Sequence, residues 1–297
     1  SKSGERGIFS RVAAQKIAAK NGRRDATFEF GTNPCSEIIL RPNQFCNLSE
    51  VVVRAEDTLE TLKDKVRTAT ILGTLQSTLT DFRYLRKIWK TNTEEEALLG
   101  VSLTGIMDHP ILSGQADAED PYVDINYLEE WLTEMREVAI ETNIKWAEKL
   151  GINPSVAITC VKPSGTVSQL VNSASGIHPR FSPYYIRTVR ADKKDPMAQY
   201  MMDAGFPWET DVTKESTAVF SFPVAAPEGA VCTKEMGAMD QLRLWKVYQD
   251  HWCEHKPSIT VYYTDEEFLE VCSWMWKNFD SMSGISLLPH SDHVYQQ

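Results

Sequence analysis

The chain has 297 residues and a net charge of −10 at neutral pH, with 42% hydrophobic residues. This composition is typical of a globular protein with a substantial core. The acidic charge argues against nucleic acid or an anionic membrane as a partner, because phosphate groups attract basic surfaces. The longest apolar runs are shorter than a membrane span, and the first residues do not form a secretory signal. We therefore expect a cytoplasmic protein.

Six cysteines are scattered along the chain, too few to form a disulfide scaffold for a protein of this size. We expect them to be reduced thiols with catalytic or core roles: Cys35, Cys46, Cys160, Cys232, Cys253 and Cys272.

Helical periodicity dominates the first half of the chain. Apolar residues recur at helical spacing over 8–21, 56–82 and 127–150, and Gly151 is expected to end the last of these helices. The stretch 27–40 is interrupted by a proline and is expected to be extended.

Short β-branched or aromatic runs bounded by Pro or Gly predict strands in the second half. These are 156–161, 184–189, 217–224, 258–263 and 284–288, with helices expected over 167–171, 234–253 and 265–279. Strands that alternate with helices predict an α/β fold with a largely parallel sheet. The longer loops, about 110–125, 173–183 and 223–233, do not resemble domain linkers, so a single domain over 1–297 is expected.

The run Asn33-Pro34-Cys35-Ser36-Glu37 places an amide, a thiol and a carboxylate at alternate positions. Pro34 favours extended backbone before it, and alternate side chains of an extended segment point the same way. We therefore expect Asn33, Cys35 and Glu37 to face one ligand. A lone cysteine in such a run is most often a buried small residue, but a second thiol follows at Cys46.

A second candidate site follows the expected strand 156–161, where Lys162-Pro163 leads into a Ser/Gly-rich stretch that opens a helix. A helix N-terminus offers free N–H groups to a phosphate, and the stretch lacks the spacing of a Walker A loop. An ordinary capped helix start is the alternative. The candidate phosphate-binding residues are Ser164, Gly165, Thr166, Val167 and Ser168.

Taken together, these motifs resemble the ribonucleotide reductases. Asn-Pro-Cys-x-Glu followed by Phe45-Cys46-Asn47-Leu48 is similar to the finger loop of that family. Further segments match in the same order along the chain: 101–105, 162–168, 175–179 with 184–187, 252–258 and 284–289.

The resemblance implies a role for each site residue. Cys35 would become the thiyl radical that abstracts the ribose 3′-hydrogen, Glu37 would accept the 3′-hydroxyl proton, and Asn33 would orient the 2′ side. Cys46 would be one of two thiols that reduce C2′. The implied substrate is a ribonucleotide, with the triphosphate favoured over the diphosphate, and partners would include a nucleotide effector and an external thiol reductant such as thioredoxin.

The downstream segments are most similar to the adenosylcobalamin-dependent class II enzymes. This implies adenosylcobalamin as cofactor, although no contacting residue is identified. The implied fold is the second half of a ten-stranded α/β barrel, with a finger loop over about 27–50, a helical segment over about 56–150 and a half-barrel over about 155–297. The first barrel half and the second reducing thiol would precede Asn33. We therefore expect the chain to act with an amino-terminal half, or to be one piece of a split enzyme.

Other interpretations remain open at this point. The large subunit of a class I reductase would relay a radical through a tyrosine pair, but Tyr262-Tyr263 is better explained by packing. A non-catalytic half-barrel that binds nucleotide is a second alternative, and a thiol hydrolase using His178 with Cys35 is a third. His251 and His255 have the spacing of a zinc pair, yet we expect them to be structural and assign no metal site.

Overall fold

The computed structural model of the chain describes residues 7–115 and 126–290. These residues form two compact units, one comprising 7–115, 126–180 and 229–290, and the other 181–228. The expectation of a single domain over 1–297 stays a prediction. No helix in the described part of the chain is both long and apolar enough to span a lipid bilayer.

Three predicted helices of the first unit are confirmed, two of them shorter than predicted and the third one residue longer. Helix α1 spans Arg11–Lys20, α2 spans Leu59–Gln76, and α4 spans Asn126–Leu150. The Ser10 hydroxyl caps α1 by accepting from the amide of Ala13, and Thr58 and Thr61 form a capping box at α2. Gly151 follows α4 with a φ of 66°, the left-handed conformation expected of a helix terminator.

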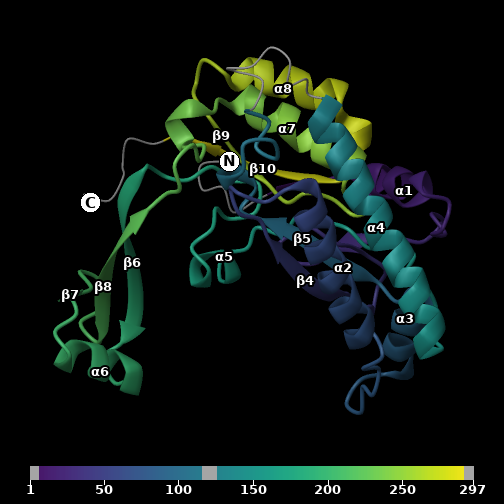
Figure 1. Cartoon of the computed structure of the whole chain (residues 1–297), viewed down its shortest axis with the longest axis horizontal. Helices are drawn as coiled ribbons and strands as arrows, with labels where there is room; N and C mark the ends of the chain where they lie inside the picture. The colour runs from purple at the N-terminus through teal and green to yellow at the C-terminus, as the bar shows by residue number, and fades with distance from the viewer. Residues whose placement is uncertain (1–6, 116–125, 291–297) are drawn as a thin grey trace. The chain divides into compact units, whose positions relative to one another are not determined.

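The remaining helices frame the second half of this unit. They are α3 (Lys87–Glu96), α5 (Val167–Leu170), α7 (Ala238–His251) and α8 (Phe268–Lys277), with 3₁₀ turns at Ile106–Asp108, Thr233–Glu235 and Phe279–Ser281. Helix α3 was not predicted, because its sequence is polar and lacks an apolar stripe. Helices α2 and α4 pack side by side (Figure 1).

Parallel strand pairs form the centre of the first unit. Strand β4 (Asn47–Val52) pairs with β5 (Leu99–Thr104), and β9 (Thr260–Tyr263) pairs with β10 (Gly284–Pro289). Strand β1 (Gly7–Phe9) lies antiparallel along β10, and a small hairpin joins β2 (Gly31–Thr32) to β3 (Ile39–Leu40).

The predicted strand 156–161 is wrong as a regular strand, but its residues link the two parallel pairs. Isolated parallel bridges join Val101 to Thr159 and Val161 to Pro257. The amide of Val161 donates to the carbonyl of Lys256 at 3.2 Å. Pro257 has no N–H to donate, so a regular ladder cannot continue through it. The result is a row of five extended parallel segments, in the order β4, β5, 157–161, 257–263 and β10.

Large aromatic side chains fill the core beneath this row. Trp245, Tyr248 and Trp252 on or just after α7 are fully buried. Each polar atom is satisfied by a backbone carbonyl: Trp245 Nε1 by Pro257 at 2.9 Å, Tyr248 Oη by Leu112 at 2.8 Å and Trp252 Nε1 by Cys160 at 2.8 Å. Buried aromatic groups with satisfied polar atoms fix α7 against the central row.

The second unit is an antiparallel sheet with one helix. Its elements are β6 (Tyr184–Asp192), α6 (Pro196–Asp203), β7 (Trp208–Thr210) and β8 (Thr217–Ala225), and the strand order is β6-β8-β7. The expectation of a largely parallel sheet is wrong here. Parallel pairs also make up only part of the first unit's pairing. The small core of this unit is formed by Ala198, Ala218 and Phe220.

Candidate functional site

A turn presents the Cys35 thiol at the surface. The amide of Ser36 donates to the Asn33 carbonyl at 2.9 Å, and Ser36 has a φ of 65°. Asn33 Oδ1 accepts from the amide of Ile38 at 3.0 Å, which ties the two sides of the turn together. Cys35 is therefore exposed at the turn, and it is a free thiol.

The expectation that Asn33, Cys35 and Glu37 face one side is wrong, because the segment is a turn and alternation applies only to extended backbone. Cys35 is exposed, whereas Glu37 is 0% exposed. The left-handed conformation of Ser36 separates the two side chains, and no glycine or Asn-Gly pair in this run indicates such a conformation.

Glu37 is a buried carboxylate that lacks hydrogen bonds. Neither of its oxygens has a hydrogen-bond partner among the described residues. The nearest charged atom is Lys162 Nζ, 3.6 Å from Glu37 Oε1. An unsatisfied buried carboxylate is costly, so these two oxygens are available to accept from a ligand.

Cys46 lies just before β4 and is influenced by the same carboxylate. Burial raises the pKa of the Cys46 thiol well above its ordinary value, and the negative charge of Glu37 raises this pKa further. The thiol is thus held in its protonated form, in which it retains a hydrogen to transfer. The structure thus brings Cys46 and Glu37 into one electrostatic environment.

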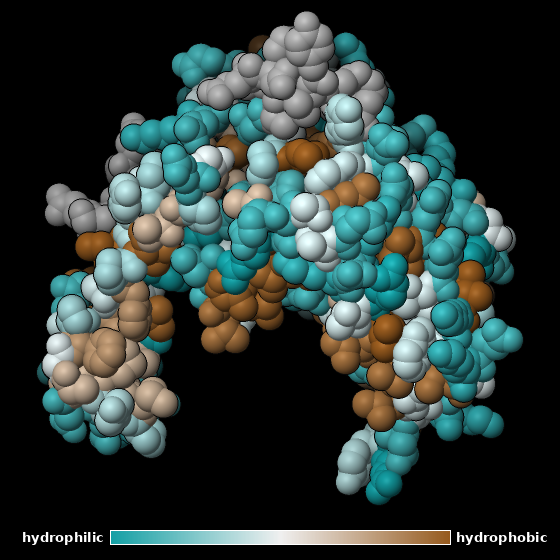
Figure 2. All heavy atoms as spheres, in the orientation of Figure 1, coloured by the Kyte–Doolittle hydropathy of each residue, from teal (hydrophilic) through white to brown (hydrophobic). Residues whose placement is uncertain are grey.

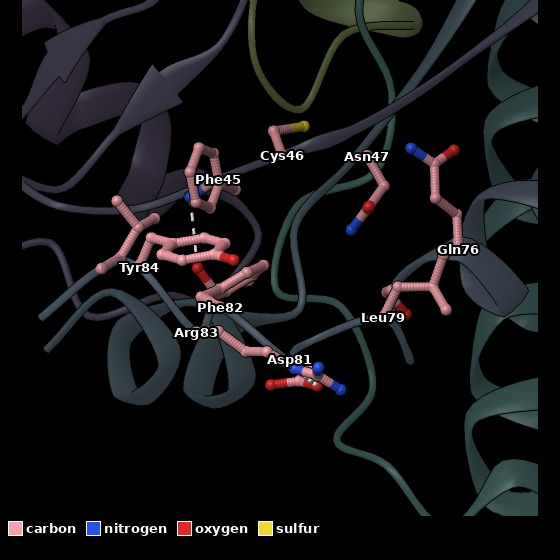
Figure 3. A pocket seen from close by; sticks show the side chains of 12 residues that line it. Phe45, Cys46, Asn47, Gln76, Leu79, Asp81, Phe82, Arg83 and Tyr84 are labelled. Atoms are coloured by element: carbon pink, nitrogen blue, oxygen red, sulfur yellow. Dashed lines mark hydrogen bonds and ion pairs between the residues drawn. The ribbon is translucent and has the colours of Figure 1, made fainter. Parts of the chain in front are cut away.

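A pocket of about 560 Å³ opens beside Cys46. Figure 3 shows the aromatic side chains of Phe45, Phe82 and Tyr84 gathered on one side of it, with Asn47 and Gln76 on the other. The Phe45 and Phe82 ring centroids are 5.0 Å apart in an edge-to-face contact. Cys46 is therefore reachable from an aromatic-lined hollow.

The candidate phosphate-binding residues divide into two groups. The hydroxyls of Ser164 and Ser168 are used inside the loop: Ser164 Oγ accepts from the amide of Ser168 at 3.2 Å, and the Ser168 hydroxyl donates to the Ser164 carbonyl. Gly165, Thr166 and Val167 are exposed at the first turn of α5. The free amides of a first helical turn suit an anion, although α5 has only four residues and a correspondingly small dipole.

A carboxyl group also lies near this loop. Glu50 on β4 interacts with the hydroxyls of Ser164 and Thr104 and with the charge of Lys162, while its burial raises the pKa of the carboxyl. Lys162 therefore interacts with two carboxyl groups, Glu37 of the finger loop and Glu50 of β4. This electrostatic link joins the finger loop to the phosphate loop.

Two residues named in the alternatives are occupied by structural contacts. His178 Nε2 accepts from the amide of Thr260 at 3.1 Å, and Nδ1 lies 3.1 Å from the Ser175 carbonyl. Both ring nitrogens thus contact backbone, which disfavours His178 as a base for Cys35. Tyr263 is buried in the main core, as the packing interpretation of Tyr262-Tyr263 anticipated.

The candidates from the sequence did not include Lys256, Ser258 or Glu50, and they assigned no role to Lys162. One feature of the sequence could have indicated these residues: the triplet Lys-Pro-Ser occurs twice, at 162–164 and 256–258. The structure places the two copies beside each other through the Val161–Pro257 bridge. Sequence alone did not indicate that they would be neighbours.

Comparison with known proteins identifies similar chains. An adenosylcobalamin-dependent ribonucleoside-triphosphate reductase of Lactobacillus acidophilus is 28% identical over 88% of this chain and 37% of its own length. Reductases with the same description from Levilactobacillus brevis and Euglena gracilis are 27% and 28% identical over 99% and 96% of this chain, and over 42% and 38% of their own lengths. The family resemblance is confirmed. No family model matches the chain.

Solved structures show the same relation at the level of the fold. A B12-dependent class II ribonucleotide reductase superposes on 90% of this chain and 40% of its own with a TM-score of 0.73 and 24% identity. The alpha subunit of the class Id reductase of Actinobacillus ureae superposes on 97% of this chain and 59% of its own with a TM-score of 0.63 and 13% identity. The α/β fold is thus that of ribonucleotide reductase catalytic chains. The chain spans about two fifths of the length of the curated relatives named above.

Proposed function

We propose that the chain contributes the radical-forming part of a ribonucleotide reductase site. The observation that carries the proposal is the arrangement around Glu37. A fully buried carboxylate with two unpartnered oxygens lies two residues from an exposed thiol and shares its electrostatic environment with a second, protonated thiol. The relatives named above supply the reaction class.

The chain's own groups account for the proton and hydrogen transfers. Cys35 gives up its hydrogen atom to the initiating radical, and the resulting thiyl radical abstracts the 3′-hydrogen of the ribose and returns it to C3′ after the reduction at C2′. Glu37 accepts the proton of the 3′-hydroxyl, which helps water to leave from C2′. Cys46 and a second thiol then supply two electrons and two hydrogens, so that the C2′ hydroxyl is replaced by hydrogen while a disulfide forms. Gly165, Thr166 and Val167 hold the substrate phosphate, and the triphosphate is the favoured substrate.

Adenosylcobalamin is the proposed cofactor, on the strength of the relatives' descriptions. Its homolysis supplies the initiating radical. The exposed Cys35 thiol fits a radical acceptor that an external group can reach. The described residues give no recognisable set of contacts for the corrin ring.

An amino-terminal half is the proposed partner, together with a nucleotide effector and a thiol reductant such as thioredoxin. Strand β4 pairs only with β5 in the described structure, so its other edge is open to a strand from a partner. Exposed apolar side chains lie along and beyond α2, including Leu72 at 59% and Leu79 at 72% exposed. Figure 2 shows hydrophobic patches on the surface in the region of α2 and α3. Because the chain spans about two fifths of the length of the relatives named above, these surfaces support assembly with a second polypeptide.

The test is electron paramagnetic resonance on the chain combined with a candidate amino-terminal half, adenosylcobalamin, a ribonucleoside triphosphate and a dithiol. We expect a Co(II)–thiyl coupled signal and deoxyribonucleotide product, both lost in Cys35→Ala. Cys272→Ser is the matched control, because Cys272 is also an exposed free thiol but lies on α8. A signal that survives Cys35→Ala would contradict the assignment.

A non-catalytic nucleotide-binding half-barrel is the second candidate, favoured by the exposed first turn of α5. It predicts nucleotide binding by the chain without turnover in any combination with a partner. The class I alternative predicts dependence on a metal-containing subunit instead of adenosylcobalamin.

A further inference from the structure

Lys256 is an unusual buried lysine. It is 1% exposed, and lysines are rarely buried without a partner of opposite charge in direct contact. Its Nζ donates to Ser36 Oγ at 2.7 Å and to the Gly284 carbonyl at 3.0 Å. Ser36 directly follows Cys35, and Gly284 begins β10. The amine therefore connects the turn that carries Cys35 to the central row of strands.

The backbone of Gly284 approaches this amine closely. A Cβ at Gly284 would lie 2.7 Å from Lys256 Nζ and 2.8 Å from Ser36 Oγ. Both distances are shorter than real carbon contacts, so a side chain at position 284 would displace the Lys256 amine or the Ser36 hydroxyl from its place in their hydrogen bond. Gly284 is thus matched to the buried lysine.

Two further hydrogen bonds hold the same turn. The amide of Lys256 donates to the Glu37 carbonyl at 3.2 Å, and Ser258 Oγ donates to the Cys35 carbonyl at 2.6 Å. Three consecutive residues, Cys35, Ser36 and Glu37, are therefore each held from the segment 256–258. We name this set of contacts, made by Lys256 and Ser258, the finger-loop clamp.

Two titratable groups near Lys256 lie on other elements: Glu37 of the finger loop, and Cys253 two residues after α7. Burial lowers the pKa of Lys256 to about 8, and the negative charge of Glu37 opposes this shift. Burial keeps the Cys253 thiol protonated and uncharged. Lys162 faces Glu37 at 3.6 Å and competes with Lys256 for its charge. A buried cation of this kind lowers fold stability, and apolar replacements of such groups are often neutral or stabilising.

We propose that Lys256 is a positioning residue, which holds the turn at Cys35 in the conformation that presents its thiol, although its burial lowers the stability of the fold. The catalytic meaning of that conformation rests on the proposed function. The clamp itself does not, since it is a property of the folded chain. Because Lys256 orders the turn but lowers the stability of the fold, its replacement should change the two properties in opposite directions. Both can be measured without enzymatic turnover.

The experiment compares Lys256→Met with the unmodified chain by hydrogen–deuterium exchange and thermal unfolding. We expect exchange in the peptide covering 33–38 to become about tenfold faster, because a charge-assisted hydrogen bond is lost. The melting temperature is expected to stay the same or rise. Lys16→Met is the control, because Lys16 is an exposed lysine on α1, and it should change neither quantity.

Two additional measurements keep the test decisive. Ser36→Ala removes the acceptor and should loosen the same peptide, with no additive effect in the double variant. In the unmodified chain, exchange at 33–38, corrected for its intrinsic pH dependence, should accelerate above pH 8 as the amine loses its proton, and this step should be absent in Lys256→Met. A lower melting temperature with unchanged exchange at 33–38, or faster exchange spread evenly over the chain, would overturn the proposal. Because no step requires nucleotide, failure of the proposed reductase activity would be seen separately.

Discussion

Several ionisable side chains near the Cys35 turn are buried where their charged forms are poorly solvated. Glu37 has no hydrogen-bond partner among the described residues, and burial shifts the pKa of Lys256 downward. His255, the neighbour of Lys256, is also fully buried. Stability and pH are therefore linked in this region more tightly than at the surface.

His255 gives the clearest pH prediction. Its Nε2 donates to the Leu99 carbonyl at 2.9 Å and its Nδ1 accepts from the amide of Ile39 at 3.3 Å, so the ring is neutral. Burial lowers the pKa of His255 to about 3. Below pH 6.5 the unfolded chain gains a proton that the folded chain does not bind. The free energy of unfolding therefore decreases as the pH is lowered, by up to about 1.4 kcal/mol per pH unit.

Urea unfolding at pH 7, 6 and 5 checks this expectation. His255→Gln should flatten the dependence, because the amide can still donate to Leu99 but does not titrate. Burial also lowers the pKa values of His109 and His178, which remain in both proteins, so the difference between the two curves isolates His255. Parallel curves would show that His255 is not the responsible group.

The residues of the finger loop could be chosen from the sequence, but their geometry could not. Cys35, Glu37 and Cys46 were chosen because the residue type alone identifies a thiol or a carboxylate. Ser36 has a left-handed backbone, and its hydroxyl accepts from Lys256, which is 220 positions away in the sequence. No pattern within 33–37 indicates that these residues contact a residue as distant in the sequence as Lys256.

At the scale of elements, the finger loop and the parallel pair approach each other at Gly100 of β5. A Cβ there would lie 2.4 Å from Leu48 of β4 and 2.9 Å from Ile38 of the finger loop, measured to their methyl carbons. The glycine therefore allows both segments to approach β5.

Gly100→Ala is expected to destabilise the fold by about 1–3 kcal/mol, because the added methyl group overpacks this contact. Chemical denaturation measures the change. Gly31→Ala is the control, since a Cβ at Gly31 meets no atom within 4 Å and its φ is not left-handed. Equal effects of the two substitutions would contradict the packing argument.

Helices were predicted more accurately than strands for a physical reason. The apolar stripes of α2 and α4 persist over many turns and indicate their elements directly. The stretch 157–161 has the composition of a strand, but whether it forms a regular ladder depends on Pro257 of its neighbour. Whether a segment forms a regular strand depends on the strands that pair with it, and a single sequence does not identify these neighbours.

At the scale of the whole molecule, the unit 181–228 is inserted at a point where the flanking chain is already paired. The amide of Arg180 donates to the Val231 carbonyl at 2.8 Å, and the amide of Thr233 donates to the Arg180 carbonyl at 2.8 Å. Arg180 also forms a buried ion pair with Asp108 at 2.8 Å. The two ends of the insertion are thus fixed by the first unit itself.

Replacing 181–228 with a short Gly-Ser turn should leave the first unit folded with cooperative thermal unfolding. Near-ultraviolet circular dichroism checks this, because Trp245 and Trp252 report packing of its core. The control is a deletion of equal length within 59–106, which removes α2 and β5 and should abolish the signal. Loss of the signal on excision of 181–228 would show that the first unit depends on the insertion.

The close approach at Gly284 also has a consequence for evolutionary variation. Because a methyl group at position 284 would overlap the end of the lysine at position 256 in its present position, we expect the two positions to vary together. Lineages that keep lysine at 256 should retain glycine at 284, whereas those with a shorter residue at 256 are free to acquire alanine or serine there. An alignment of close homologues would reveal this covariation. A phylogenetic tree built from it would show which of the two substitutions comes first.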